Sequence, residues 1–366
     1  MNSSTSNKEE AITSQQSFEN GVLRLQASIK AMLEHRESYS GKQATSEAPS
    51  LWKDYCQIFS YLFSLNPTQL RNIRFHAWMI DGTGLSFYSM HYPLASGEAV
   101  AEDTKYKLYT KDLPERYILS EPQTHNLPSQ FNFSIEYDER FINRSLNRHQ
   151  ISIANLYHSG VFDFLDTLET PIIMEIGAGY GGLSHGLKQS SPAATCLIVD
   201  LPEMLIFSAT YLLLNNPDKR ILVCDPDVDI AFEVSQGLER YDFVFAPNYR
   251  FHELDALKGI PLFLNIQSFQ EMTEEQVTEY LDFAQSHVSG YVYSDNLDRI
   301  HNNPSLSSVT THLSSRFNLY PKPSYYQNLW KDETDLKGYK YYKRYLGYKE
   351  SLPSNFNAER IHLPLV

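Results

Sequence analysis

The stretch PIIMEIGAGYGGLSHGL, residues 171–187, constrains the fold more than any other part of the chain. An apolar run ends at Ile176, glycines follow at 177, 179, 181 and 182, and Leu183 and Leu187 then recur at helical spacing. Glycine loses much conformational entropy on folding, so four in six positions are expected where the backbone needs positive φ or a ligand approaches it. The pattern predicts a strand, a tight turn and a helix whose N-terminus faces a ligand.

From residue 171 onward, strand-like runs alternate with helix-like runs, which is typical of parallel βαβ units. The expected strands are 172–177, 195–201, 243–247, 262–268 and 291–295, and ILVCD at 221–225 competes with FVFAP at 243–247 for the third place. The last intervening helix is expected to begin with Thr273 as N-cap and Gln276 as its capping-box partner. Alternating aromatic and polar residues at 317–326 and 338–348 predict two further strands, antiparallel to each other.

The first half of the chain reads as mainly helical. Residues 1–16 are polar and are expected to be disordered, whereas apolar residues recur at helical spacing from Phe18 to His35. KQATSEAPS (42–50) resembles a linker, the next helix ends at Pro67, and the helix at 144–168 is interrupted at Gly160. The expected division is an N-terminal extension (1–50), a helical cap (51–150), an α/β domain (151–348) and a C-terminal tail (349–366).

Composition excludes several classes of protein. The 366-residue chain has 31 basic and 44 acidic residues, a net charge of −13, which argues against binding to a nucleic-acid backbone. The three cysteines, Cys56, Cys196 and Cys224, have no metal or disulfide spacing and are expected to be buried thiols, which favours a reducing, cytoplasmic location. We find no secretory signal and expect no membrane span. A homo-oligomer is compatible with the composition.

The glycine turn admits two cofactors. Gly177, Gly179 and Gly182 fit GxGxxG, which is typical of a dinucleotide site. Glu175, inside the strand, would repel a pyrophosphate but attract a sulfonium or ammonium group, and Tyr180 is bulky for a phosphate-binding turn. The pattern E-x-G-x-G-x-G resembles motif I of class I S-adenosylmethionine (SAM)-dependent methyltransferases. Asp200, at the end of the second strand, suits ribose hydroxyls with either cofactor, or else the N-cap of the next helix.

A narrower resemblance covers residues 65–348. RNIRFHAWMIDGTGLSFY, INRSLNRHQISIANLY, EIGAGYGGLSHGL, IVDLPEMLIFSATYLL, LNIQSFQEMTEEQVTEYLDF and GYVYSDN are similar to the sugar O-methyltransferase family. The resemblance implies an α/β Rossmann-like seven-stranded methyltransferase sheet with an N-terminal helical cap. It also implies SAM as methyl donor and a saccharide or nucleotide-sugar acceptor. The expected cofactor-binding residues are Glu175, Gly177, Ala178, Gly179, Tyr180, Gly181, Asp200, Leu201 and Asn265.

Methylation of a sugar hydroxyl is expected to require a carboxylate or histidine base, or else a metal ion, because the hydroxyl is a poor acid. Glu271, in LNIQSFQEMT at a strand end, is the first candidate, although an acid there also suits a helix N-terminus. His252 and His91 are the other candidate bases. The expected substrate-binding residues are Ser268, Gln270, Asn296 and Arg148.

Other polar residues leave alternatives open. Asp295, Asp298 and His301 carry ligand types for a divalent ion, but their spacing indicates no specific metal site. Arg74, His76, Arg144 and Arg148 suit an anionic sugar or surface salt bridges, and Asp225 is a candidate for adenine if ILVCD is the third strand. The alternatives to a methyltransferase are an NAD-dependent enzyme and a scaffold protein that has lost its cofactor.

Overall fold

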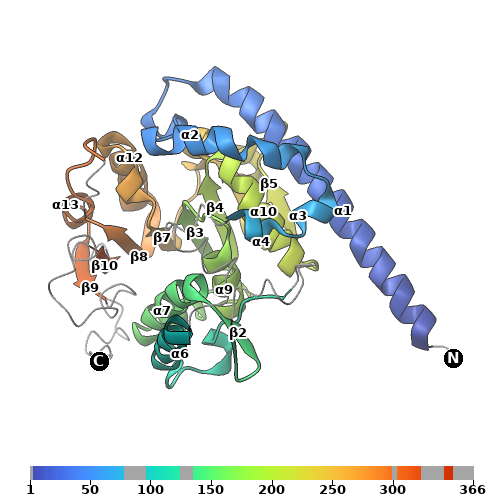
Figure 1. Ribbon diagram of the computed structural model, residues 1–366. Helices are drawn as coiled ribbons and strands as arrows, with labels where there is room; N and C mark the ends of the chain where they lie inside the picture. The colour runs from blue at the N-terminus through green and yellow to red at the C-terminus, as the bar shows by residue number, and fades with distance from the viewer. Residues whose placement is uncertain (1–2, 78–95, 124–134, 299–302, 323–341, 349–366) are drawn as a thin grey trace.

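The computed structural model describes residues 3–77, 96–123, 135–298, 303–322 and 342–348, which form a layered α/β fold around one large sheet (Figure 1). The sheet has eight strands in the order β5-β6-β4-β3-β7-β8-β10-β9. Their bounds are β3 Ile172–Ile176, β4 Thr195–Asp200, β5 Ile221–Val223, β6 Phe243–Pro247, β7 Ile260–Ile266, β8 Val288–Leu297, β9 Asn318–Pro321 and β10 Tyr342–Tyr348. Neighbouring strands from β5 to β8 are parallel, and β10 is antiparallel to both β8 and β9.

This architecture confirms the predicted Rossmann-like α/β fold with a helical N-terminal region and an antiparallel C-terminal pair. The sheet has eight strands, however, and the expected number was seven. The two segments that compete for the third place are both strands. FVFAP, as β6, pairs with β4, whereas the three residues of β5 pair with the outer side of β6. A short, half-buried strand at an edge adds to the sheet without changing the order of the other seven.

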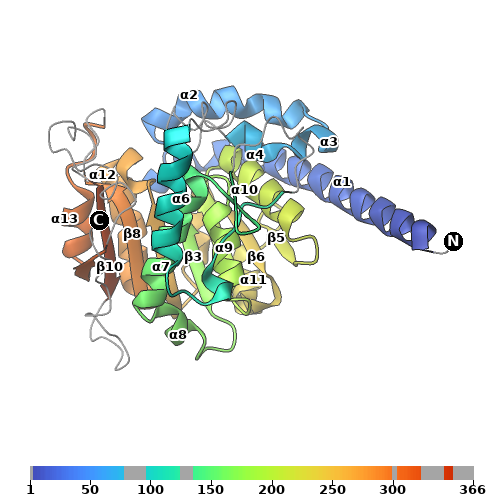
Figure 2. The same ribbon diagram turned by 60° about the horizontal axis from the view of Figure 1, so that its bottom comes forward.

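Helices cover both faces of the sheet (Figures 1 and 2). Residues of α7 to α10 pack with Ile173 and Ile198 on one face, and residues of α11 to α13 and η8 pack with Met174 and Leu197 on the other. Alternate residues of a strand point to opposite faces, so two buried layers require strands that are apolar at nearly every position. The bounds are α7 Arg144–His158, α8 Val161–Leu165, α9 Gly182–Ser190, α10 Pro202–Asn215, α11 Ile230–Ser235, η7 Leu238–Arg240, η8 Asn248–Leu254, η9 Phe269–Glu271, α12 Glu274–His287 and α13 Val309–Ser314.

Local signals placed several of these ends correctly. Gly160 takes a left-handed conformation (φ +73°) and separates α7 from α8, as its position in the helical pattern predicts. The capping box of α12 is present: Gln276 N donates to Thr273 Oγ1, and Thr273 N donates to Gln276 Oε1. The three cysteines are free and buried.

The first part of the N-terminal region, from α1 to α4, lies against α10 and over one end of the sheet, with α2 crossing the top in Figure 1, whereas the later helix α6 packs against α7. Its elements are α1 Ser3–Arg36, η1 Glu37–Tyr39, η2 Ala44–Ser46, α2 Ser50–Phe59, η3 Ser60–Ser64, α3 Pro67–Leu70, α4 Ile73–His76, α6 Ser96–Thr110, η5 Glu115–Tyr117, β1 Ile135–Tyr137 and β2 Arg140–Ile142. Helix α1 begins at Ser3, within the stretch expected to be disordered, because polar residues extend a helix that its later apolar residues anchor. Pro67 begins α3, where a fixed φ suits the first helical position.

Among the described residues, no helix is both long enough and apolar enough to cross a membrane. The sheet also contains a buried ion pair. Arg344 of β10 and Asp295 of β8 are cross-strand partners, and their buried side chains form a salt bridge.

Arg344→Met is expected to destabilise the protein by about 3–5 kcal/mol, because it leaves the Asp295 carboxylate buried without its cation. Urea unfolding at pH 7.5 measures the change. Arg220→Met is the matched control, since Arg220 pairs with Asp242 on the surface and is expected to cost about 1 kcal/mol or less. Equal losses in the two variants would contradict a structural role for the buried pair.

Candidate functional site

The glycine turn after β3 has the geometry of a ligand-binding turn. Gly177, Gly179 and Gly181 take φ values of +74°, +59° and +86°, which side-chain-bearing residues rarely adopt. A Cβ on Gly177 would lie 2.2 Å from Ser268 Oγ, so the loop after β7 presses directly on the turn. The turn is thus fixed from two sides, by Ser268 and by the bond from Gly177 N to Val199 O of β4.

Glu175 is a buried acid directly beneath this turn. Its side chain is 3% exposed and accepts a 2.5 Å hydrogen bond from Ser184 Oγ of α9. No Lys, Arg or His of the described chain forms an ion pair with it. Burial raises the pKa of Glu175 to about 7, and the Ser184 bond offsets only part of that cost. A carboxyl group in this environment favours a cation supplied from outside the protein.

Asp200 ends β4 beside the same turn. Its carboxylate accepts hydrogen bonds from Leu201 N at 2.8 Å and Gly179 N at 3.3 Å. Burial, with a smaller contribution from the charge of Glu175, raises the pKa of Asp200 to about 7. The N-cap of α10 is Leu201, so Asp200 does not cap that helix with its side chain. Its carboxylate is held by the turn itself.

Polar residues at the ends of β7 and β8 and in the loop after β7 are hydrogen-bonded to one another. Asn265 donates to Ile176 O at 2.9 Å and accepts from Asn296 Nδ2 at 3.0 Å. Gln270 Oε1 accepts from Leu297 N at 2.6 Å, and Asn296 Oδ1 accepts from Gln270 N at 3.4 Å. These side chains join the ends of β3, β7 and β8, so they fix the rim of the site. Direct contact of Asn265, Gln270 or Asn296 with a ligand stays a prediction.

Glu271 ends η9 on the same rim, and its partner comes from the N-terminal region. Trp52 Nε1 of α2 donates to Glu271 Oε2 at 2.6 Å. Loss of solvent raises the pKa of Glu271 to about 7, while the bonds from Trp52 and Gln270 oppose the rise. A carboxyl that titrates near neutrality suits a general base. The sequence pattern gave no indication of Trp52, which lies 219 residues from Glu271.

The other two candidate bases are His252 and His91, and the candidate cation for the substrate is Arg148. His252 of η8 packs near Tyr39 with ring centroids 5.9 Å apart, and its Nδ1 has no hydrogen-bond partner in the described chain. His91 lies outside the described residues. Arg148 Nη1 donates to Gln267 Oε1 at 3.3 Å, beside the loop that contacts the glycine turn.

Several residues considered from the sequence form structural contacts. The Arg74 guanidinium lies 4.0 Å from the centroid of the Tyr180 ring. The bulky Tyr180 side chain therefore points into the helical cap. Arg74 also forms a buried salt bridge with Glu121. Asp225 follows β5 at the sheet edge, where its Oδ2 accepts from Ser28 Oγ at 2.6 Å, so it does not adjoin β4.

The acidic residues considered for a metal are otherwise engaged. Asp295 pairs with Arg344, and Asp298 accepts from Ser308 Oγ and Thr310 N, both at 2.8 Å. His301 lies outside the described residues. Within the described part of the chain, no group of three or more His, Cys, Asp and Glu side chains is arranged to hold a metal ion.

Comparison with known proteins gives structural likeness alone. No family model and no curated protein matches the sequence. Magnesium protoporphyrin IX methyltransferase from Synechocystis PCC 6803 with bound SAM has 10% identity and a TM-score of 0.32, over 70% of this chain and 99% of that one. An O-methyltransferase family protein from Burkholderia thailandensis has 11% identity and a TM-score of 0.34, over 74% and 77%. The Methanococcus jannaschii fibrillarin pre-rRNA processing protein has 11% identity and a TM-score of 0.36, over 64% and 86%. At such values, likeness carries no functional argument, which must come from the site's own residues.

Proposed function

We propose that this chain is a SAM-dependent O-methyltransferase that transfers a methyl group to a sugar hydroxyl of a glycan or its nucleotide-linked precursor. The observation that carries the proposal is Glu175, a buried carboxyl beneath a glycine turn, with no cationic partner among the described residues. SAM brings an ammonium and a sulfonium group, and either would satisfy this carboxyl.

The remaining residues of the turn fit the same ligand. The Asp200 carboxylate, 9% exposed at the end of the neighbouring strand, suits the two hydroxyls of a ribose. NAD would also satisfy Asp200, but its pyrophosphate would bring negative charge to the turn above Glu175. The presence of both Glu175 and Asp200 at this turn therefore favours a cationic nucleoside over a dinucleotide.

SAM supplies an electrophilic methyl group on a leaving group that departs as a neutral thioether. The oxygen of the acceptor hydroxyl forms the new bond to the methyl carbon as the carbon–sulfur bond breaks, and the hydroxyl proton passes to a base. We assign that role to Glu271, whose pKa of about 7 allows it to take a proton at neutral pH. Trp52 holds the carboxyl in place, and alignment of the two reactants lowers the barrier further.

A saccharide acceptor rests on the sequence resemblance and on the polar rim. Ser268 and Arg148 lie next to the glycine turn or its contacting loop, where they can orient hydroxyl or anionic groups of a sugar. A sugar hydroxyl is a weaker acid than a phenol, so its methylation depends more on a base, and Glu271 can supply that base. We place the reaction in the cytoplasm, where unpaired thiols such as the three here persist.

Calorimetric titration with S-adenosylhomocysteine (SAH), and separately with NADH, tests the cofactor. We expect micromolar binding of SAH alone, and loss of that binding in Gly179→Arg and Asp200→Ala. Gly259→Arg is the matched control, because Gly259 also has positive φ (+71°) but lies before β7, at the opposite end of the strand from the site. Unchanged SAH affinity in both site variants, or binding of NADH alone, would refute the proposal.

A further inference from the structure

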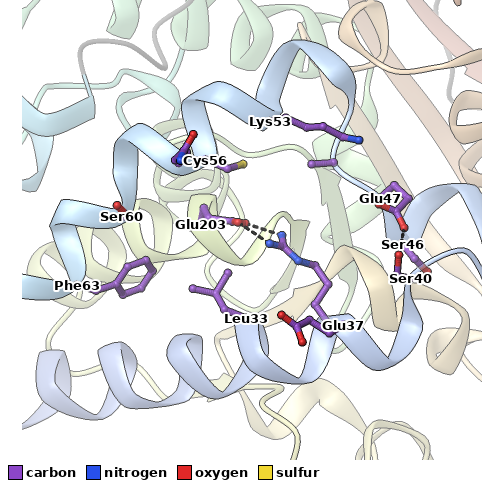
Figure 3. A pocket seen from close by; sticks show the side chains of 13 residues that line it. Leu33, Glu37, Ser40, Ser46, Glu47, Lys53, Cys56, Ser60, Phe63 and Glu203 are labelled. Carbon is purple, nitrogen blue, oxygen red and sulfur yellow. Dashed lines mark hydrogen bonds and ion pairs between the residues drawn. The ribbon is translucent and has the colours of Figure 1, made fainter.

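A cavity of about 480 Å³ lies between α1 and α2, beside the first turn of α10 (Figure 3). Its volume falls within the range of about 300–1,000 Å³ that is typical of sites for small molecules. Neither the glycine turn nor Glu175, Asp200 or Glu271 belongs to its lining. The cavity is therefore separate from the residues proposed to bind the cofactor and to take the proton.

Polar groups of the cavity are held in place by the fold. Arg36 of α1 makes a bidentate ion pair with Glu203 of α10, with N–O distances of 2.9 and 2.8 Å. The Arg36 side chain is 28% exposed, and a guanidinium has five N–H donors, so donors remain for a ligand. Glu47 Oε1 accepts from Ser40 Oγ at 2.8 Å and from Gly41 N at 3.0 Å. These bonds fix the Glu47 carboxylate and leave its Oε2 to accept from a ligand.

Residues 46–48 form one wall of the cavity, in a segment whose sequence resembles a linker. Gln276 Nε2 of α12 donates to Ala44 O at 3.0 Å and to Glu47 O at 2.9 Å. The Glu279 carboxylate of the same helix accepts from Ala44 N and Thr45 N, both at 2.9 Å. The wall is thus formed before a ligand arrives, which lowers the entropic cost of binding.

The charges of the lining nearly cancel. Two cationic residues face three carboxylates, and the five are Arg36, Lys53, Glu37, Glu47 and Glu203. A diphosphate or a carboxylate would add negative charge to a partly buried space in which carboxylates are already in excess. A cationic ligand would in turn lie against Arg36 and Lys53. The lining therefore favours a neutral ligand that can both donate and accept hydrogen bonds.

The rest of the lining combines uncharged polar groups with apolar surface. Gln57 and Ser60 supply an amide and a hydroxyl from the end of α2, and the half-buried Leu33 and Phe63 supply apolar surface. Each hydroxyl of a saccharide is one donor and accepts through two lone pairs. The C–H groups of a sugar ring can pack against the Phe63 ring. A neutral saccharide matches both kinds of surface.

We propose that this cavity binds a neutral saccharide unit of the acceptor, away from the sugar whose hydroxyl is methylated. The inference rests on the proposed function, because it takes Glu271 to mark the position of the reacting hydroxyl. Trp52, which bonds to Glu271, and Lys53, which lines the cavity, are adjacent in α2. Adjacent helical residues point about 100° apart, so the two positions lie on different faces of one helical turn. The acceptor is then a glycan, since the lining disfavours the diphosphate of a nucleotide-linked precursor.

Binding of the full chain to an oligosaccharide array tests the cavity. The array carries neutral oligosaccharides and oligosaccharides that contain uronic acids, and UDP-glucose is titrated separately by calorimetry. We expect binding of a neutral oligosaccharide in preference to both anionic probes. Gln57→Trp, which fills the cavity with an indole, is expected to abolish that binding in calorimetry. Ile58→Trp is the matched control, since Ile58 is the next residue of α2, is 50% exposed and does not line the cavity.

Three results would overturn the saccharide site: no binding of a neutral oligosaccharide by the wild type, a preference for an anionic probe, or binding that survives in Gln57→Trp. SAH binding by the same wild-type sample would then leave the methyltransferase proposal standing. Oligosaccharide binding that is lost in Gln57→Trp would support the site, even if SAH did not bind and the proposed cofactor were refuted. Thermal melting of each variant verifies the fold, and Ser60→Trp, at the end of the same helix, carries the test if Gln57→Trp does not fold.

Discussion

Glu271→Gln is expected to lower kcat by about 10²–10⁴-fold and to leave SAH affinity within about twofold, because it removes a proton acceptor and preserves the shape of the side chain. The wild type is expected to lose activity as pH falls through about 7, since a base must be ionised and the pKa of Glu271 is about 7. SAH release with the saccharide or nucleotide sugar that supports the highest turnover measures both effects.

The Trp52→Phe variant distinguishes a role of the indole in setting the pKa of Glu271 from a role in packing alone. The indole N–H bond stabilises the ionised carboxylate, so its loss is expected to raise the pKa of Glu271 and move the acid limb upward by about one unit. Activity lost at pH 7 should return at pH 9. Tyr55→Phe, on the same helix and 5.4 Å from Trp52 by ring centroids, is the matched control and should leave the limb in place.

A flat pH profile between 5 and 8 in the wild type, or a kcat for Glu271→Gln within fivefold of wild type, would exclude Glu271 as the base. His252 would then be the candidate to test next among the described residues, since its Nδ1 has no partner within them. A loss of activity in Trp52→Phe that is uniform across pH would assign the indole a packing role only.

Glu175→Gln is expected to change stability and binding in opposite directions. The folded-state pKa of Glu175 is raised to about 7 from an ordinary 4.5, so the folded protein binds a proton that the unfolded chain releases. The resulting penalty is absent below pH 4.5, grows between 4.5 and 7, and is complete above 7. At pH 8 the variant should therefore be more stable by up to about 3 kcal/mol, with the gain fading toward pH 4.5. Urea unfolding at both pH values measures it.

The same change should weaken binding of SAH by about tenfold or more, because the carboxylate no longer meets the ligand's ammonium group. Glu121→Gln is the contrasting control. Its buried carboxylate pairs with Arg74 at 3.0 Å, so removal of that charge should destabilise the protein and leave binding unchanged. A destabilised Glu175→Gln variant at pH 8 would contradict an uncompensated acid, and undiminished SAH affinity would contradict its role toward the ligand.

The sequence by itself determined the features whose causes are local. Strand periodicity and the glycines at 177, 179 and 181 predicted the strand, turn and helix, because positive φ and alternation are properties of a few adjacent residues. The break at Gly160 and the capping box of α12 followed for the same reason. The α/β class and the antiparallel C-terminal pair were likewise evident from the order of such runs.

Tertiary structure alone decided which distant residues meet. The eighth strand, β5, exists because residues 221–223 pair with β6. No local pattern shows whether such a segment joins the edge of the sheet or stays outside it. The contact of Trp52 with Glu271 and the bond from Asn248 to Thr45 O, which ties an apparent linker to the end of β6, join residues about 200 or more apart. Tertiary structure also decided the pKa of Glu175. An acid in a strand acquires a raised pKa only when packing removes water from it and brings no cation near it.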